Sequence, residues 1–264
     1  FVLSLNGYAA NDAAWMRYCT ISPDGQQIAF SYKGDIYTVG VNGGRANQIT
    51  TNPAHDTRPI WSPNGQQIAF ASDRLGSMDI YIVDKEGGVP TRLTTHSGTA
   101  TPLAFKENRH ILFPAHILPA AHDMQFASAQ FPQVYEVSTS GGRPIMFSSM
   151  PMEDINFSAD GKTILYHDKK GYEDAWRKHH TSSITRDIWM CTLDDERSYK
   201  KLSTFHGEDR TPVWVNADTY YYLSEQNGSF NVFKASINGN SPIQITKHDK
   251  HPVRFLSRAN NGTL

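Results

Sequence analysis

A cluster of hydrogen-bond donors stands out in a long polar stretch, residues 169–186. The cluster consists of Trp176, Arg177, Lys178, His179 and His180. Cationic donors beside an aromatic ring are suited to binding a carboxylate or a peptide backbone. We therefore interpret these five residues as a candidate peptide-binding site. The alternative is a solvent-exposed loop that packs on a neighbouring element, because exposed basic loops are common.

Signatures of catalysis and metal binding are missing from the sequence. It contains no GxSxG elbow, Gly-rich phosphate loop, HExxH or paired CxxC. His116 and His122 are six residues apart in an expected loop, without further ligands at metal-binding spacing. We expect no catalytic residue, no metal and no cofactor. Asp73–Arg74 and Glu208–Arg210 lie beside expected turns, and we interpret them as structural ion pairs.

The elements that position the cluster come from an internal repeat. The stretch SPDGQQIAF at 22–30 returns 40 residues later as SPNGQQIAF at 62–70. Pro at the second and Gly at the fourth turn position suit a type I turn. Residues 67–71 then alternate polar and apolar, as a half-buried strand does. A second alternating run at 79–83 and a short one at 91–94 complete the unit. Four short strands in about 40 residues are typical of a β-propeller blade.

Later copies are looser, but an aromatic residue ends the expected first strand of each. The markers are Trp61, Phe105, Phe157, Trp214 and Phe255, and Ile21 takes this place in the first copy. Their spacings are 40, 44, 52, 57 and 41 residues. We therefore predict an all-β fold, a six-bladed β-propeller of four-stranded antiparallel blades with the sixth blade truncated. The expected blades are approximately 15–54, 55–98, 99–150, 151–206, 207–249 and a partial 250–264.

The third and fourth copies are lengthened by insertions at 114–133 and 169–186. Insertions in a repeat protein map to loops on one face, where binding residues concentrate. The second insertion carries the donor cluster, which favours the binding interpretation.

Composition excludes two classes of partner. Lys and Arg total 25 against 26 Asp and Glu, whereas a nucleic-acid-binding protein usually has a basic excess or a basic face. No window reaches the roughly 20 apolar residues that a membrane helix needs. We therefore expect neither nucleic acid nor a membrane span.

The first ten residues, FVLSLNGYAA, have another character. An apolar run, a polar break and small residues are typical of the end of a signal peptide and its cleavage site. We expect the mature chain to begin near Asn11, the propeller to occupy 11–264, and the protein to be exported, to the periplasm. The alternative is a first β-strand. Cys19 and Cys191 fall in non-adjacent copies, so we expect two free thiols rather than a disulfide.

Several stretches resemble a known family. PIWSPNGQQIAF is similar to the propeller repeats of TolB and of tricorn-type proteases. WMRYCTISPDGQQIAFSYKGDIYTV, HDKKGYEDAWRKHHTSSITRDIW, GEDRTPVW, GSFNVFK and KHPVRFLSRANNGTL together resemble the N-terminal six-bladed propeller of exported bacterial tricorn protease homologues. The likeness covers nearly the whole chain after Asn11.

The resemblance implies a serine peptidase whose chemistry lies elsewhere. A second propeller-like region, a PDZ domain and a peptidase domain with the nucleophilic serine would follow. This propeller would guide peptides or products to and from that site, and homo-oligomers are possible. In the archaeal relative, two arginines after the second repeat anchor a peptide carboxylate. The corresponding stretch here, 96–105, holds no arginine, so Arg177 and Lys178 are candidate substitutes.

Two alternatives stay open. One is a TolB-like propeller that binds protein partners, and the other is the propeller of a prolyl-oligopeptidase-type enzyme. The reading frame after Leu264 discriminates between them. A PDZ and peptidase region there supports the tricorn-type peptidase, an early stop codon supports the TolB-like propeller, and a GxSxG elbow supports the prolyl-oligopeptidase-type enzyme.

Overall fold

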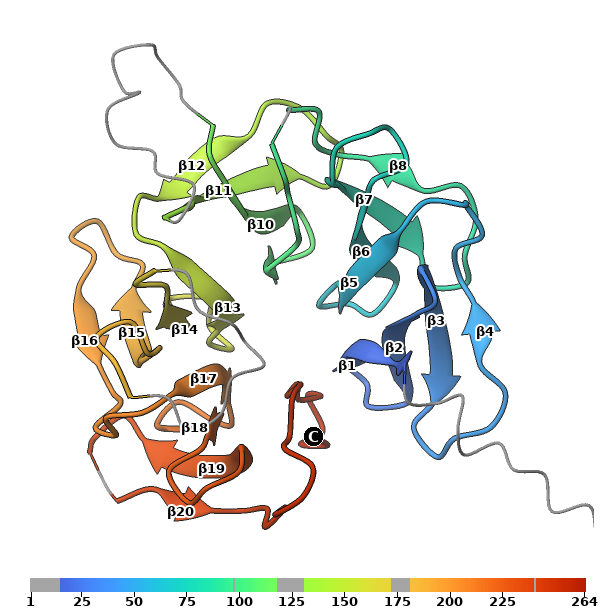
Figure 1. Ribbon diagram of the computed structural model, residues 1–264. Coiled ribbons are helices and arrows are strands. Elements are labelled where there is room, and N and C mark those ends of the chain that lie inside the picture. Colours follow the sequence, from blue (N-terminus) through green and yellow to red (C-terminus); the bar gives the residue numbers. More distant parts are fainter. Residues whose placement is uncertain (1–14, 97, 118–130, 172–180, 240) are drawn as a thin grey trace, which may run out of the picture.

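The regular elements of the protein are β-sheets arranged around a common axis (Figure 1). The computed structural model describes residues 15–96, 98–117, 131–171, 181–239 and 241–264. Within these residues, consecutive strands pair antiparallel into five four-stranded sheets. Each sheet is one blade, and the blades follow one another around the ring in chain order (Figure 1). An all-β propeller of four-stranded antiparallel blades is thereby confirmed.

The strands of each blade are numbered in chain order. The first blade contains β1 (Arg17–Ile21), β2 (Gln27–Tyr32), β3 (Asp35–Gly40) and β4 (Asn47–Gln48). The second contains β5 (Asp56–Trp61), β6 (Gln67–Ser72), β7 (Asp79–Asp84) and β8 (Thr91–Arg92). The third contains β9 (Ala104–Lys106), β10 (His110–Ala115), β11 (Gln133–Ser138) and β12 (Ile145–Ser148). The fourth contains β13 (Met152–Phe157), β14 (Thr163–Asp168), β15 (Ile188–Thr192) and β16 (Tyr199–Lys201). The fifth contains β17 (Asp209–Trp214), β18 (Thr219–Ser224), β19 (Asn231–Ser236) and β20 (Ile243–Gln244).

The tight turns between first and second strands form as the repeat predicts. In the first blade, the N–H of Gly25 donates to the carbonyl of Ser22 at 2.9 Å, and Gly25 has a φ of 72°. In the second blade, Gly65 donates to Ser62 at 2.8 Å with a φ of 66°. Glycine suits this position because a positive φ strains a residue that carries a Cβ.

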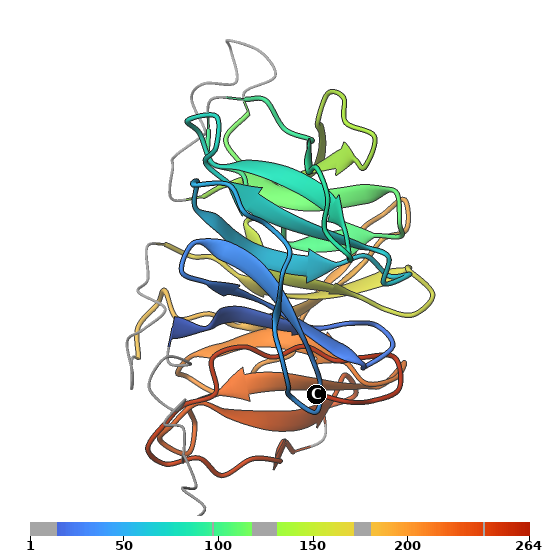
Figure 2. The same cartoon turned by 90° about the vertical axis from the view of Figure 1, so that its right-hand side faces the viewer.

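Four of the five hydrophobic clusters among the described residues lie between two blades, and the fifth lies between the last blade and residues 253–256. The first and second blades share a cluster that includes Ile36 and Phe70, and the second and third share one that includes Ile80 and Phe113. In β6, every residue from Ile68 to Ser72 is buried. The sequence predicted half-burial for this strand, but a blade inside the ring is covered on both faces. Figure 2 shows the first two blades, blue and teal, from the outer side of the ring.

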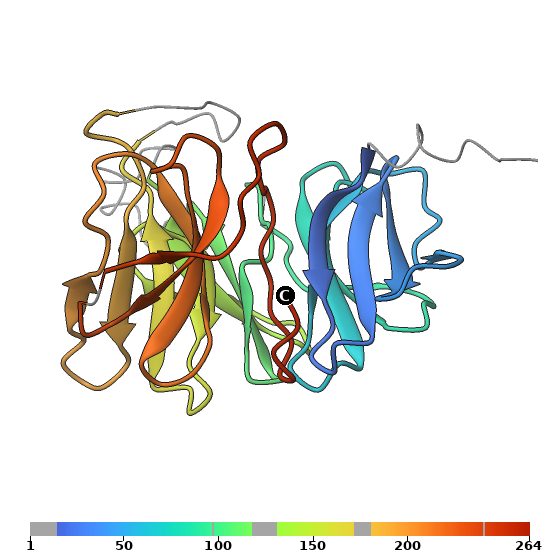
Figure 3. The same ribbon diagram turned by 90° about the horizontal axis from the view of Figure 1, so that it is seen from below.

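The prediction of a sixth, truncated blade is wrong, because the described residues form five blades. Residues 250–264 contain no strand, although Phe255 fits the aromatic marker. Their backbone groups bind neighbouring blades instead of a strand ladder. The N–H of Val253 donates to the carbonyl of Phe230 at 2.9 Å, and that of Asn260 to Pro23 at 2.8 Å. This terminal segment passes between the fifth and first blades (Figure 3).

The terminal segment also contributes side chains to both neighbours. Val253 and Leu256 pack against the buried Phe230 of the fifth blade. On the other side, the Phe255 ring lies 5.3 Å from that of Tyr18 in β1.

Cys19 and Cys191 are free, with Cys191 buried and Cys19 half-buried.

Candidate functional site

The candidate residues Trp176, Arg177, Lys178, His179 and His180 lie outside the described residues, as does His122. His116 is exposed, directly after β10. The two ends of the insertion, 169–171 and 181–186, are described. The part of the site that the structure defines is therefore the base of this insertion, at the seam between the fourth and fifth blades.

Lys170 joins the two ends of the insertion. Its Nζ donates to the carbonyl of Thr185 at 2.6 Å, contacts the carboxylate of Asp187, and lies 3.5 Å from Asp168 Oδ2. The backbone N–H of Asp187 donates to Asp168 Oδ1 at 2.8 Å. The chain therefore leaves and re-enters the blade at one closely tied point.

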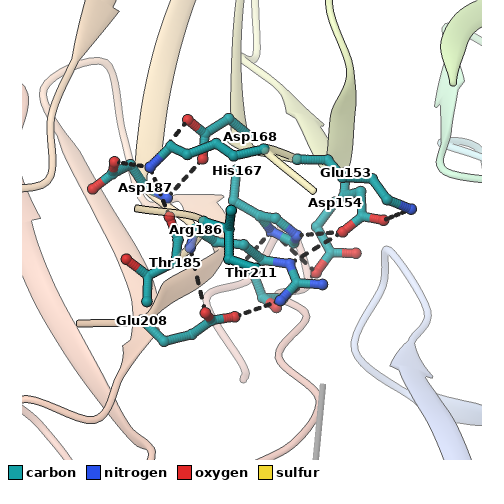
Figure 4. A network of polar contacts seen from close by, with 12 residues as sticks. Glu153, Asp154, His167, Asp168, Thr185, Arg186, Asp187, Glu208 and Thr211 are labelled. Atoms are coloured by element: carbon teal, nitrogen blue, oxygen red, sulfur yellow. Dashed lines mark hydrogen bonds and ion pairs between the residues drawn. The ribbon is translucent and has the colours of Figure 1, made fainter. Parts of the chain in front are cut away.

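Arg186 connects this point to the next blade. Its Nη1 lies 2.6 Å from Glu208 Oε1, and its Nε lies 3.2 Å from Glu153 Oε2 (Figure 4). The side chain of Arg186 is 9% exposed and that of Glu208 is 5% exposed. Burial opposes the charge of Arg186, but the two carboxylates outweigh it and raise the pKa of the guanidinium.

His167 extends the network from the middle of the fourth blade. Its Nε2 lies 3.1 Å from Glu153 Oε2, and the backbone N–H of Thr211 in β17 donates to its Nδ1 at 3.2 Å (Figure 4). The hydroxyl of Thr211 donates to Asp154 Oδ2 at 2.7 Å, so it does not face the imidazole. The arrangement joins the fourth and fifth blades.

Glu153 stays ionised within this network. Burial would raise its pKa, but the hydrogen bond with His167 and the charges of Arg186 and Lys169 outweigh burial. The pKa of Glu153 therefore lies far below its usual range. Lys169 Nζ contacts Glu153 Oε1 at 3.2 Å.

The first strands of four of the five described blades each contain a residue with a strained backbone conformation. Tyr18, Arg58, Asp154 and Thr211 have φ values of 52°, 54°, 49° and 52°, and each lies at a register shift in the first strand of its blade. A β-branched residue such as Thr211 rarely adopts this conformation. A β-bulge of this kind re-aims a side chain, and here it brings the hydroxyl of Thr211 to the Asp154 carboxylate.

Repeat positions separate the unusual residues of the seam from the ordinary ones. Each third strand except that of the third blade begins at or next to an Asp or Asn. The residue after this Asp or Asn donates its backbone N–H to a Thr or Ser hydroxyl from the end of the same blade. The Asp or Asn and the hydroxyl residue of each blade are Asp35 and Thr50, Asp79 and Thr94, Asp187 and Ser203, and Asn231 and Thr246. Asp187 is thus a repeated structural residue. His167 is different, because its equivalents in the other second strands are Ser31, Ala71, Pro114 and Leu223.

Sequence reasoning identified the insertion but missed most of its base. It interpreted Glu208–Arg210 as structural, and the ion pair of Glu208 with Arg186 confirms this for Glu208. Arg74 is also in an ion pair, with Asp56 at 2.8 Å rather than with its neighbour Asp73. His167 and Arg186 were overlooked, although a histidine among small and apolar equivalents was a readable signal.

Two classes of site receive no support from the described part of the chain. No group of three or more His, Cys, Asp or Glu side chains there could hold a metal ion. No helix found there has the length and apolar character to cross a membrane.

Comparison with known proteins identifies the family of this propeller. Residues 13–264 match the family model described as the tricorn protease N-terminal beta propeller domain. The chain belongs to this family. Tricorn protease homolog 1 of Streptomyces coelicolor is 24% identical over 237 residues, covering 89% of this chain and 21% of that protein. The chain therefore spans about a fifth of the length of this relative.

Solved structures agree on the fold. The crystal structure of the tricorn protease has a TM-score of 0.75 at 19% identity, covering 92% of this chain and 23% of that one. TolB from Acinetobacter baumannii has a TM-score of 0.62 at 14% identity, covering 88% of this chain and 52% of that one.

Proposed function

We propose that this propeller guides peptide substrates or products to and from the catalytic domain of a tricorn-like serine peptidase. The family match over residues 13–264 carries this proposal. Because the chain spans about a fifth of its relative, the peptidase chemistry belongs to a region beyond the matched one. The test is the reading frame after Leu264. A PDZ region followed by a serine peptidase domain supports the proposal, and an early stop codon contradicts it.

The insertion at 169–186 is the proposed peptide contact. Its base is tied down by Lys170 and Arg186, so the intervening residues are presented from a fixed point at the seam. Trp176, Arg177, Lys178, His179 and His180 would supply cationic donors and a ring for a peptide carboxylate and backbone.

Fluorescence anisotropy of a labelled peptide with a free carboxylate tests this contact. Charge-assisted hydrogen bonds contribute about 1.5–3 kcal/mol each, so Arg177→Ala with Lys178→Ala should weaken binding at least about tenfold. Lys200→Ala, an exposed lysine in the outermost strand β16, is the matched control and should leave affinity unchanged. Equal affinities of all three proteins would refute the contact.

A TolB-like protein-binding module is the second candidate function, favoured by the likeness to TolB from Acinetobacter baumannii. It predicts that a folded protein partner, rather than a short peptide, is captured by the 264-residue chain.

We also propose export, with residues 1–10 ending a signal peptide and residues 11–264 forming the mature propeller. N-terminal sequencing of the protein expressed in a bacterium from its full reading frame tests this, and a product that retains residues 1–10 would contradict it.

A further inference from the structure

Asp209, the first residue of β17, is a buried carboxyl group that the proposed function does not use. It is 1% exposed. Its Oδ1 has no hydrogen-bond partner among the described residues. A buried ionised carboxyl group normally needs a countercharge, because removal from water disfavours the charged form.

The second blade shows what an aspartate at this position ordinarily has. Asp56 begins β5 as Asp209 begins β17, and each lies opposite the last residue of its blade's second strand. Arg74, two residues after that strand, donates to both oxygens of Asp56 at 2.9 and 2.8 Å. The same place in the fifth blade is held by Gln226, whose N–H binds Ser224 Oγ as that of Arg74 binds Ser72 Oγ. The fifth blade therefore keeps the aspartate but replaces its arginine with a neutral residue.

The charges around Asp209 make its ionisation harder. Asp187 and Glu208 are nearby carboxylates that raise its pKa. Their cations are already engaged, since Lys170 and Lys201 contact Asp187 and Arg186 contacts Glu208.

Asp209 also has neutral neighbours. They are the hydroxyls of Ser203 and Ser224 and, on β18, the phenols of Tyr220 and Tyr222. Burial, followed by the two carboxylates, raises the pKa of Asp209 to about 7, and hydrogen bonds from the two serines oppose this rise.

The position of Asp209 couples its charge to the base of the insertion. Its backbone N–H donates to the carbonyl of Arg186 at 3.1 Å. Arg186 and Asp187 close the insertion, and both belong to the charged network of the seam (Figure 4). A new negative charge at Asp209 would lie beside two existing ones at this point and weaken the seam.

We propose that Asp209 is a pH-sensitive switch that holds the seam between the fourth and fifth blades, and with it the base of the 169–186 insertion, closed when protonated and loosens it when ionised. The inference does not depend on what the insertion binds. Its direction follows from linkage. The folded state binds this proton more tightly than the unfolded chain, so the stabilisation is complete at low pH and is lost as the pH rises toward about 7.

Hydrogen exchange followed by mass spectrometry tests the proposal on the 264-residue chain between pH 5.5 and 8.5. After correction for intrinsic exchange rates, opening of 181–192 and 209–214 should increase up to about tenfold per pH unit below the pKa and level off above it. Asp209→Asn, which mimics the protonated form, should remove this increase. Gln226→Arg should also remove it, because it restores the arrangement of the second blade.

Asp218→Asn, at an exposed turn of the same blade, is the matched control and should keep the wild-type pH dependence. A wild-type protein without this increase, or an Asp209→Asn protein that retains it, would overturn the proposal. Should Asp209→Asn fail to fold, Gln226→Arg decides alone. Loss of the increase in that variant supports the switch, and its retention refutes it.

Discussion

Replacing Arg186 with methionine removes a buried cation that contacts two carboxylates. Leaving one partner of a buried ion pair uncompensated costs about 3–5 kcal/mol. Glu208 would be the stranded partner, since its side chain is only 5% exposed. Glu153 is 25% exposed and keeps Lys169 at 3.2 Å, so it should add little. We therefore expect Arg186→Met to lower the free energy of unfolding by about 3 kcal/mol, at the low end of that range.

Equilibrium unfolding in urea, followed by tryptophan fluorescence, measures this loss. Total stabilities of single domains are about 5–15 kcal/mol, so the shift is readily resolved. Arg109→Met is the control, because the side chain of Arg109 is 81% exposed and its Nε lies 3.9 Å from Oε2 of Glu107, whose side chain is 74% exposed. It should change the free energy of unfolding by no more than about 0.5 kcal/mol.

The double variant Arg186→Met with Glu208→Leu tests the physical reason for the loss. Replacing a whole buried ion pair with apolar side chains is often nearly neutral. The double variant should therefore be more stable than Arg186→Met alone, by about 2 kcal/mol. If Arg186→Met were as mild as Arg109→Met, or if the double variant were the less stable of the two, the assigned role of Arg186 would be wrong.

Two further predictions concern the terminal segment and the acid side of stability. Gly25→Ala should cost about 1 kcal/mol more than Gly161→Ala in the same urea assay. Both positions have positive φ, 72° and 69°, but a Cβ on Gly25 would lie 2.5 Å from Asn261 Nδ2, whereas Gly161 has nothing within 4 Å. Equal losses would refute close packing of the terminal segment on the first blade. Because the pKa of Glu153 is depressed in the folded state, its stabilisation is present above its ordinary value of 4.5 and is lost as the pH falls below it. Glu153→Gln should therefore flatten the fall of the thermal midpoint between pH 6 and 3, and identical acid slopes would contradict this.

The local features of the blades could be predicted because they depend on residues close in sequence. The turn at Ser22–Gly25 is made by a Pro, a Gly and a hydroxyl within four residues, and the strands follow from period-two alternation. The same reasoning failed at Phe255. It fits the aromatic marker, but a strand also needs a paired neighbour, and the backbone of residues 250–264 binds turns and loops of other blades instead.

The contacts of the seam could not be predicted from the sequence because they join residues that are far apart along the chain. His167 binds Glu153, 14 residues earlier, and the N–H of Thr211, 44 residues later. Asp56 and Asp209 occupy the same repeat position, but Asp56 binds Arg74, 18 residues later, whereas Asp209 lies near the carboxylates of Asp187 and Glu208. Sequence patterns therefore predicted where the insertion lies but not how its base is held.

Photo-crosslinking tests most directly whether the insertion at the seam between the fourth and fifth blades contacts peptide. A peptide with benzoylphenylalanine next to its free carboxylate is irradiated with the 264-residue chain, and the crosslinked residues are mapped by mass spectrometry. The account predicts crosslinks within residues 169–186. Crosslinks confined to the outermost strands β4, β8, β12, β16 and β20 would contradict it.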